Sequence, residues 1–321
     1  MTKAQAKEIQ LKEKQKIDVV VPEISISQKI MRILEDQGLA NSAEGLHERV
    51  NAFPEPNRST LARCFDEGKE GNSFYNAVAI EPIAGKILSI RYAQIYDTIY
   101  LIYALFNSII TESDLILDVG TCTGFTPITL SKLGMGKWTG IDQSTKCIDY
   151  AKNTAKDAGC LKNVSFTRST LDSYSKTSKS QFKLVINSRG PLLSSKNESY
   201  KTISKLIAES GFLVYIEEYV HDQADALKIY NKSGLSLIYR DIVGGWNQTE
   251  EDWGVWSFSV FFKGHIDLPT GKYKKEYESL WHSHFRDYCN GEARHKPEQK
   301  TQCMMREFFR KPFSFENRMK S

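Results

Sequence analysis

The sequence predicts an α/β protein with a doubly wound, mostly parallel sheet of seven strands. Three observations carry this prediction. Strand-like apolar runs alternate with helical patterns from residue 114 onward, a glycine-containing turn follows the first run, and the last two runs have no helix between them. Alternating strands and helices imply parallel strands joined by right-handed crossovers. The unconnected last pair predicts that the final strand is antiparallel.

Each element follows from its local pattern. The seven strands are expected at 115–119, 138–142, 164–168, 182–187, 211–218, 235–243 and 254–264. Helices are expected from about 124, over 145–159, near 198–209 and near 220–233. The third strand is expected to lead into a Ser/Thr-rich loop instead of a helix, because Ser and Thr cluster there.

Changes of composition divide the 321 residues into four predicted segments. Residues 1–20 are polar and charged, and we expect a flexible N-terminus. Residues 21–113 carry apolar residues at helical spacing, with breaks at prolines and glycines, which predicts a helical lid, substrate or dimerisation region. Residues 114–264 form the predicted α/β core, and residues 265–321 a basic, aromatic C-terminal extension.

Composition argues against several classes of protein. The net charge of +4 is too small to indicate a nucleic-acid partner. The six cysteines form no C-x-x-C pair or Cys/His cluster, so we expect reduced thiols in a cytoplasmic protein and no metal site. The N-terminus lacks the apolar core of a secretory signal. The apolar run at 99–110 is too short to cross a bilayer and predicts a buried helix, so no membrane partner is expected.

The turn in "LDVGTCTGFTPITLS" (117–131) is the main candidate for a binding site. A strand end, a glycine turn and a helix start together offer backbone N–H groups and a positive dipole. Gly120 and Gly124 are spaced four apart, which does not fit the G-x-G-x-x-G fingerprint of dinucleotide-binding proteins. Asp118 stands just before the turn, where its charge can face a cationic amino group. Asp142 ends the second strand, where a carboxylate can accept both hydroxyls of a ribose.

With the closing strand pair, these features make residues 114–263 resemble a class I S-adenosylmethionine-dependent methyltransferase. The usual first motif of that family is D/E-x-G-x-G-x-G, and this sequence departs from it at Cys122. The resemblance implies a Rossmann-like fold, S-adenosylmethionine as cofactor and S-adenosylhomocysteine as product. It implies that Asp118 and the turn hold the methionine end, and that Asp142 binds the ribose, with Gln143 beside the adenine. The complete set of implied cofactor-binding residues is Asp118, Gly120, Thr121, Cys122, Gly124, Asp142, Gln143, Thr170, Leu171 and Asn187.

Substrate residues are expected just after the fourth and fifth strands, because ligands of open α/β sheets bind at the carboxyl ends of strands. Arg189 can bind a substrate carboxylate or phosphate with two parallel hydrogen bonds. Alternatively, it is an exposed arginine or one that caps a helix. Glu217 and His221 can act as a base or grip an amine, although His221 can equally be an ordinary surface histidine. Trp246 is a candidate for an aromatic pocket. Two tyrosines of the N-terminal region belong either to a substrate lid or to a helix–helix core: Tyr92 and Tyr96.

The leading functional hypothesis is a biosynthetic transferase that moves a methyl group to an oxygen or nitrogen of a small molecule. The transfer is expected to be a metal-independent in-line displacement, and a homodimer is one assembly that the N-terminal region would allow. A peptide or protein substrate, with a carboxylate held by Arg189, is the alternative. An RNA substrate is disfavoured because the N-P-P-Y or D-P-P-Y motif is absent after the fourth strand. A non-catalytic scaffold that only binds the cofactor is a further alternative.

Overall fold

The predicted sheet forms in the computed structural model, which describes residues 24–39, 46–66, 72–79, 88, 92–188, 199–218, 233–243 and 256–264. Its strands run in the order β3-β2-β1-β4-β5-β7-β6. Their bounds are β1 Leu115–Val119, β2 Lys137–Asp142, β3 Val164–Arg168, β4 Phe182–Ser188, β5 Ile207–Glu218, β6 Leu235–Val243 and β7 Trp256–Lys263.

The directions of the strands confirm the predicted fold class. Strands β1 to β5 pair in parallel, and β7 lies antiparallel between β5 and β6. The chain therefore places its last strand inside the sheet instead of at the edge. The order reverses between β1 and β4, and ligands of such sheets bind at the carboxyl ends of the strands at this point.

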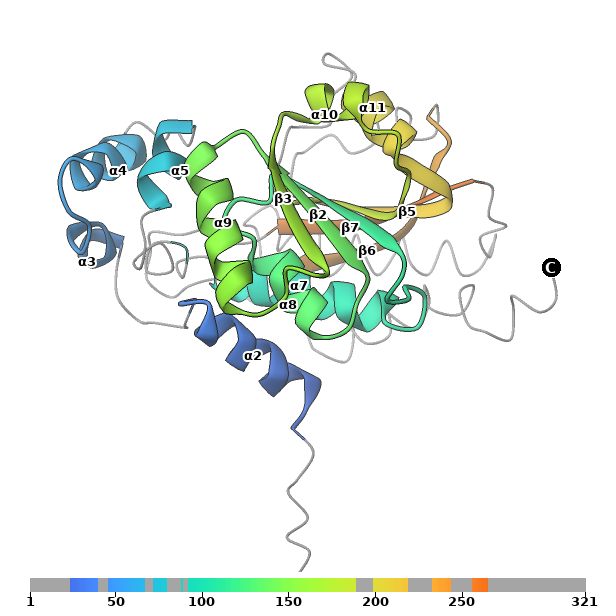
Figure 1. The fold of residues 1–321 in the computed structure, drawn as a ribbon, viewed down its shortest axis with the longest axis horizontal. Helices are drawn as coiled ribbons and strands as arrows, with labels where there is room; N and C mark the ends of the chain where they lie inside the picture. The colour runs from blue at the N-terminus through green and yellow to red at the C-terminus, as the bar shows by residue number, and fades with distance from the viewer. Residues whose placement is uncertain are drawn as a thin grey trace, which may run out of the picture.

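Helices cover both faces of the sheet (Figure 1). One face packs against α7 (Tyr92–Phe106), α8 (Phe125–Lys132) and α9 (Thr145–Asp157), and the other against α10 (Leu171–Thr177) and α11 (Ser199–Leu206). Successive residues of β1 point to opposite faces, so Ile116 lies in the first core and Leu117 in the second. This two-sided burial explains why the strands read as nearly continuous apolar runs.

The described part of the N-terminal region is helical. Its helices are α2 (Ile26–Asp36), α3 (Leu46–Asn51), α4 (Asn57–Asp66), α5 (Asn72–Val78) and α7 (Tyr92–Phe106). Helix α2 starts at a capping box formed by Ser25 and Gln28 and buries Ile30 and Leu34. At its end, Gln37 Nε2 donates a hydrogen bond of 2.9 Å to Thr129 Oγ1 of α8. This bond ties the N-terminal region to the helix that follows the glycine turn.

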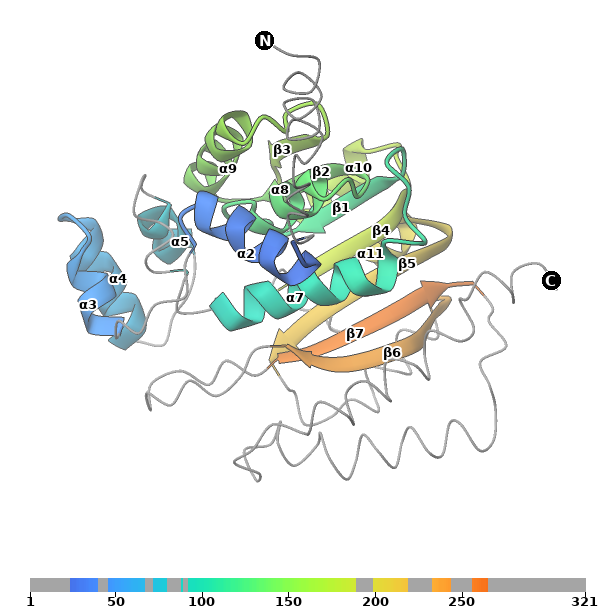
Figure 2. The same cartoon turned by 90° about the horizontal axis from the view of Figure 1, so that it is seen from below.

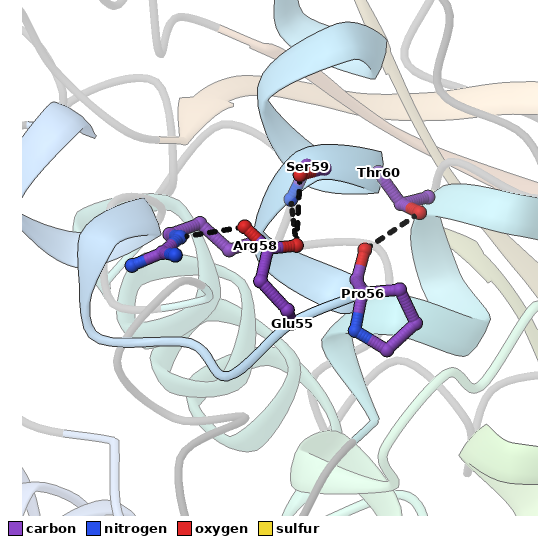
Figure 3. A network of polar contacts seen from close by, with 5 residues as sticks. All are labelled: Glu55, Pro56, Arg58, Ser59 and Thr60. Atoms are coloured by element: carbon purple, nitrogen blue, oxygen red, sulfur yellow. Dashed lines mark hydrogen bonds and ion pairs between the residues drawn. The ribbon is translucent and has the colours of Figure 1, made fainter.

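A small polar network stabilises the start of α4 (Figure 3). The Glu55 carboxylate accepts hydrogen bonds from Arg58 Nε at 2.9 Å and from the Ser59 hydroxyl at 2.7 Å. It also accepts the backbone N–H of Ser59 at 3.3 Å, one of the donors that a helix start leaves without an intrahelical partner. These bonds, that of the Ser59 side chain first, lower the pKa of Glu55.

Helix α7 contains most of the long apolar run, and its burial agrees with the prediction. Ile99 and Ile102 are fully buried, and Phe106 packs edge-on against Phe212 of β5 at 5.2 Å between ring centroids. Among the described helices, none is long and apolar enough to cross a membrane.

Two local predictions were wrong. The Ser/Thr-rich stretch after β3 forms helix α10, because Thr170 caps it by accepting the N–H of Ser173 at 3.2 Å. Strand β5 begins at Ile207, earlier than expected, because Ile207 pairs with Phe182 before an irregularity in the register. Most of the predicted helix at 220–233 lies outside the described residues. Segments 1–20 and 265–321 lie outside them completely. The boundaries of the four segments stay predictions.

Candidate functional site

The glycine turn lies at the carboxyl end of β1, beside the point where the strand order reverses. Three of its residues have left-handed backbone conformations: Gly120 with φ 73°, Cys122 with φ 49° and Gly124 with φ 81°. A Cβ atom at Gly124 would lie 2.7 Å from Cζ of Phe166, a ring of β3 that packs under the turn. The turn therefore needs glycine at Gly124 for its conformation and for space, while Cys122 takes a conformation that side chains rarely adopt.

The backbone N–H groups of the turn are bonded within the protein. Those of Gly120 and Thr121 both donate to the carbonyl of Ile141, at 2.9 and 3.0 Å. The N–H of Gly124 donates to the Thr121 carbonyl at 2.9 Å, and that of Cys122 to Asp142 Oδ2 at 3.0 Å. These four donors are thus committed to holding the turn, which differs from the expectation of a cradle of free N–H groups.

A buried carboxylate lies at the base of this turn. Asp118 is only 4% exposed, and burial raises its pKa to about 7. The Thr121 hydroxyl opposes this shift and the neighbouring Asp142 charge adds to it, with no basic side chain of the described chain among the influences. A phosphate group would be repelled by the ionised form of Asp118, whereas an ammonium group would be attracted. The electrostatics favour a cationic ligand group at this point.

A second carboxylate joins the turn to the start of α9. Asp142 Oδ1 accepts the N–H of Ser144 at 2.8 Å, while Oδ2 accepts that of Cys122. Burial raises the pKa of Asp142, and the backbone hydrogen bonds oppose that rise. An ionised carboxylate offers about four acceptor sites. Asp142 can therefore keep both backbone bonds and still accept hydroxyl donors from a ligand such as a ribose.

Helix α5 reaches this edge of the sheet, a contact that the sequence did not indicate. The Ser144 hydroxyl donates to Asn76 Oδ1 at 2.7 Å, and the Cys147 thiol donates to the Tyr75 carbonyl at 3.4 Å. Helices α3 to α5 lie beyond the end of the sheet to which β5 points (Figure 2). Ser144 was visible as a capping residue before a helical pattern, but no sequence signal pairs it with Asn76.

The residues expected around the adenine and the reacting centre lie at three strand ends. Gln143 is exposed after β2, and its carbonyl accepts Arg168 Nε at 3.3 Å. Thr170 caps α10, and the Leu171 side chain is buried in the second core instead of facing the turn. Asn187 is fully buried near the end of β4, directly opposite Val119 of β1.

The expected substrate residues are only partly described. Tyr92 and Tyr96 stack with nearly parallel rings, at 6.1 Å between centroids and 11° between planes. The Tyr96 hydroxyl is hydrogen-bonded to Ser27 of α2, so this face of α7 packs on a neighbouring helix. Glu217 is the last but one residue of β5, and its side chain is not described. Three further candidates lie outside the described residues: Arg189, His221 and Trp246.

Residues 116–211 match a family model described as a methyltransferase domain. This stretch is a methyltransferase domain. It runs from β1 into β5 and contains the turn, Asp118 and Asp142. The sheet that contains this stretch, with its strand order and antiparallel β7, has the class I fold, so the stretch is an S-adenosylmethionine-dependent methyltransferase domain. No curated protein matches the sequence.

Several solved structures resemble the methyltransferase distantly. One is magnesium protoporphyrin IX methyltransferase from Synechocystis with bound S-adenosylmethionine. Its sequence identity is 16% and its TM-score 0.46, and the match covers 70% of this chain and all of that one. Another is the [4+2]-cyclase SpnF, at 13% identity and 0.44, covering 53% and 82%. A third is the YcgJ protein of Bacillus subtilis, at 11% identity and 0.42, covering 53% and 99%. At these low scores, the fold assignment depends on the strand order and not on these likenesses.

The residues at the turn suit the cofactor of a methyltransferase. S-adenosylmethionine carries an ammonium group, a ribose and an adenine. The buried Asp118 carboxylate, for which the described residues supply no basic partner, suits the ammonium group. The Asp142 carboxylate suits the ribose hydroxyls. No cluster of three metal-binding side chains occurs within the described ranges.

Proposed function

We propose that this methyltransferase transfers a methyl group to an oxygen or nitrogen atom of a small molecule, with the cofactor bound at the glycine turn. One observation carries the cofactor assignment. The Asp118 carboxylate is buried beside a turn in which four N–H groups are already bonded, so in this proposal recognition depends on its negative charge. A ligand that brings an ammonium group there offsets the cost of burying the carboxylate.

Each site residue has a role in this proposal. Asp118 holds the ammonium group, Asp142 accepts the ribose hydroxyls, and Gln143 borders the adenine. The cofactor supplies a methyl group on a positively charged sulfur, which is already activated for transfer. The protein therefore has to align the acceptor in line with that methyl group, exclude water and take up one proton. None of these tasks calls for a Lewis acid, so the proposed transfer is metal-independent.

The position of the N-terminal helices supports a small acceptor. Helix α5 contacts Ser144 and Cys147 at the start of α9, next to the ribose carboxylate. A helical cover at this edge narrows the approach for a bulky macromolecule. Arg189 follows the last residue of β4, and Glu217 and His221 lie at and beyond the end of β5. The proposal gives them and Trp246 the task of orienting the acceptor or taking its proton.

Asp142 provides the first test of the cofactor site. Asp142→Ala is expected to weaken the binding of S-adenosylhomocysteine by at least about tenfold, because the ribose loses a charged acceptor worth roughly 1.5–3 kcal/mol. Isothermal titration calorimetry measures this change. Asp149→Ala is the matched control, since Asp149 is an exposed acid on the outer face of α9. Equal affinities in the two variants would remove Asp142 from the site.

The class of acceptor is tested by following the methyl group. The protein is incubated with methyl-labelled S-adenosylmethionine and a cell extract separated into small-molecule, protein and RNA fractions. Label is expected in the small-molecule fraction only, and it should disappear with Asp118→Ala. Label in protein would instead establish the peptide or protein alternative. Label in RNA would refute both.

A further inference from the structure

Two thiols meet beside the turn. The sulfur atoms of Cys122 and Cys147 lie 3.8 Å apart, and both cysteines are free. Cys122 belongs to the turn, and Cys147 lies in the first turn of α9, where its N–H is capped by the Ser144 hydroxyl at 3.1 Å. Their separation of 25 residues in the sequence gave no sign of this contact. Cys122 also donates its backbone N–H to Asp142, so the pair adjoins this carboxylate.

The two cysteine residues differ in exposure. Cys147 is fully buried, whereas Cys122 is partly exposed. Cys122 is therefore the residue of the pair that lies nearer to solvent, so the proposal assigns it the first reaction with a small oxidant and Cys147 the reaction with the product. A disulfide has a sulfur–sulfur distance of about 2.05 Å, so the sulfurs must approach by about 1.8 Å from contact. The hydrogen bond to Cys147, together with burial, raises the pKa of Cys122, which keeps the thiol protonated and the first reaction slow.

We propose that Cys122 and Cys147 form an oxidation site, in which a peroxide converts the two thiols to a disulfide that weakens cofactor binding. In the first step, the Cys122 sulfur attacks a peroxide oxygen, the O–O bond breaks, and hydrogen peroxide yields a sulfenic acid and water. In the second step, the Cys147 sulfur attacks the Cys122 sulfur and displaces the hydroxyl group as a second water. Two thiols lose two hydrogens in total, and an external dithiol can return them by thiol–disulfide exchange.

The cross-link would act on the site through two contacts. It draws Cys122 toward α9, although its backbone already has φ 49° and its N–H holds Asp142. It also removes the thiol hydrogen that Cys147 donates to the Tyr75 carbonyl of α5. A single disulfide bond would therefore displace the turn, the Asp142 carboxylate and helix α5 together. This inference rests on the proposed placement of the cofactor at the turn.

The experiment uses the full chain, first reduced, then exposed to hydrogen peroxide and alkylated. Peptide mass mapping is expected to show a Cys122–Cys147 linkage with the loss of two hydrogens. Calorimetry is expected to show S-adenosylhomocysteine bound about fivefold or more weakly after oxidation, with recovery in dithiothreitol. Cys147→Ser should instead leave a sulfenic acid at Cys122 that dimedone traps. Cys160→Ser, which changes a buried cysteine elsewhere, should keep the full response.

Two results would overturn the inference. One is the absence of the Cys122–Cys147 linkage in folded, oxidised protein. The other is a linkage that leaves the affinity for S-adenosylhomocysteine unchanged. Failure of the reduced protein to bind S-adenosylhomocysteine would be a failure of the proposed cofactor site instead, and peptide mapping would still report whether the linkage forms.

Discussion

Cofactor binding is expected to weaken about fiftyfold when the pH is lowered from about 7 to about 5, because Asp118 must be ionised to hold an ammonium group. Its pKa of about 7 in the free protein means that roughly half of the molecules carry the charge at pH 7. At pH 5 about one molecule in a hundred does. The ammonium group of the ligand, an α-amino group with a pKa near 8, stays protonated over this range.

The sign follows from proton linkage. Ligand binding lowers the pKa of Asp118, so binding below about pH 7 releases a proton and affinity is lost as the pH falls. The raised pKa of Asp142 acts in the same direction. In the ligand-free protein the effect on folding is opposite. Because the pKa of Asp118 in the folded state is raised above 3.8, its contribution to the free energy of unfolding decreases as the pH rises through this window.

Calorimetry with S-adenosylhomocysteine across this pH range, in two buffers that differ in ionisation enthalpy, measures both affinity and proton release. Wild-type protein should release nearly one proton at about pH 6. Asp118→Asn should bind weakly at pH 7 and lose most of the pH dependence, while Asp149→Asn should retain both. A wild-type affinity that stays level over the whole range would show that Asp118 does not bind the ammonium group.

Gly124→Ala is expected to lower the free energy of unfolding by about 3 kcal/mol. A left-handed conformation costs a residue with a side chain roughly 1–2 kcal/mol, and overpacking adds about 1–3 kcal/mol. Both apply here, since φ is 81° and the new Cβ would lie 2.7 Å from the buried ring of Phe166. Urea denaturation of the reduced protein measures the change.

Two other glycines separate the two causes. Gly159 has φ 69° with nothing within 4 Å of the position that a Cβ would take, so Gly159→Ala should cost only about 1 kcal/mol. Gly140 lies outside the left-handed region, but its Cβ would be 2.6 Å from Phe166 Cδ1, so Gly140→Ala reports the clash alone. If Gly124→Ala proves no more destabilising than Gly159→Ala, Phe166 does not support the turn in the way described.

The sequence predicted the strands and the longer helices of the core well, and missed its shortest helix. The strands of the core alternate with helices as expected, because two-sided burial leaves uninterrupted apolar runs. Helix α10 was missed because it is only seven residues long and buries one side chain, Leu171, which is too little for a period to be seen. Its capping signal at Thr170 was present, but Ser and Thr residues also favour loops.

The candidate site was predictable where it depends on strand ends. Asp118 and Asp142 each stand at or next to the end of a strand, and the parallel sheet brings them to the same edge. The bonding of the turn to the Ile141 carbonyl was not predictable, since it depends on how β1 and β2 pair. The contacts of Cys147 and Asn76 depend on tertiary packing across 25 and 68 residues, which leaves no local pattern.

Two side-chain hydrogen bonds between the described part of the helical N-terminal region and the core have a mechanical consequence. Gln37 donates a hydrogen bond to Thr129 of α8. Asn76 accepts one from Ser144, the residue that precedes α9. The residues that cap the starts of those two helices are Gly124, which belongs to the turn, and Ser144, which is bonded to Asp142. Because two separate hydrogen bonds hold the N-terminal helices, they cannot rotate away from the core about a single point. Moving them would break one of these bonds or displace α8 or the start of α9, so access to the proposed cofactor site and the rigidity of that site are coupled.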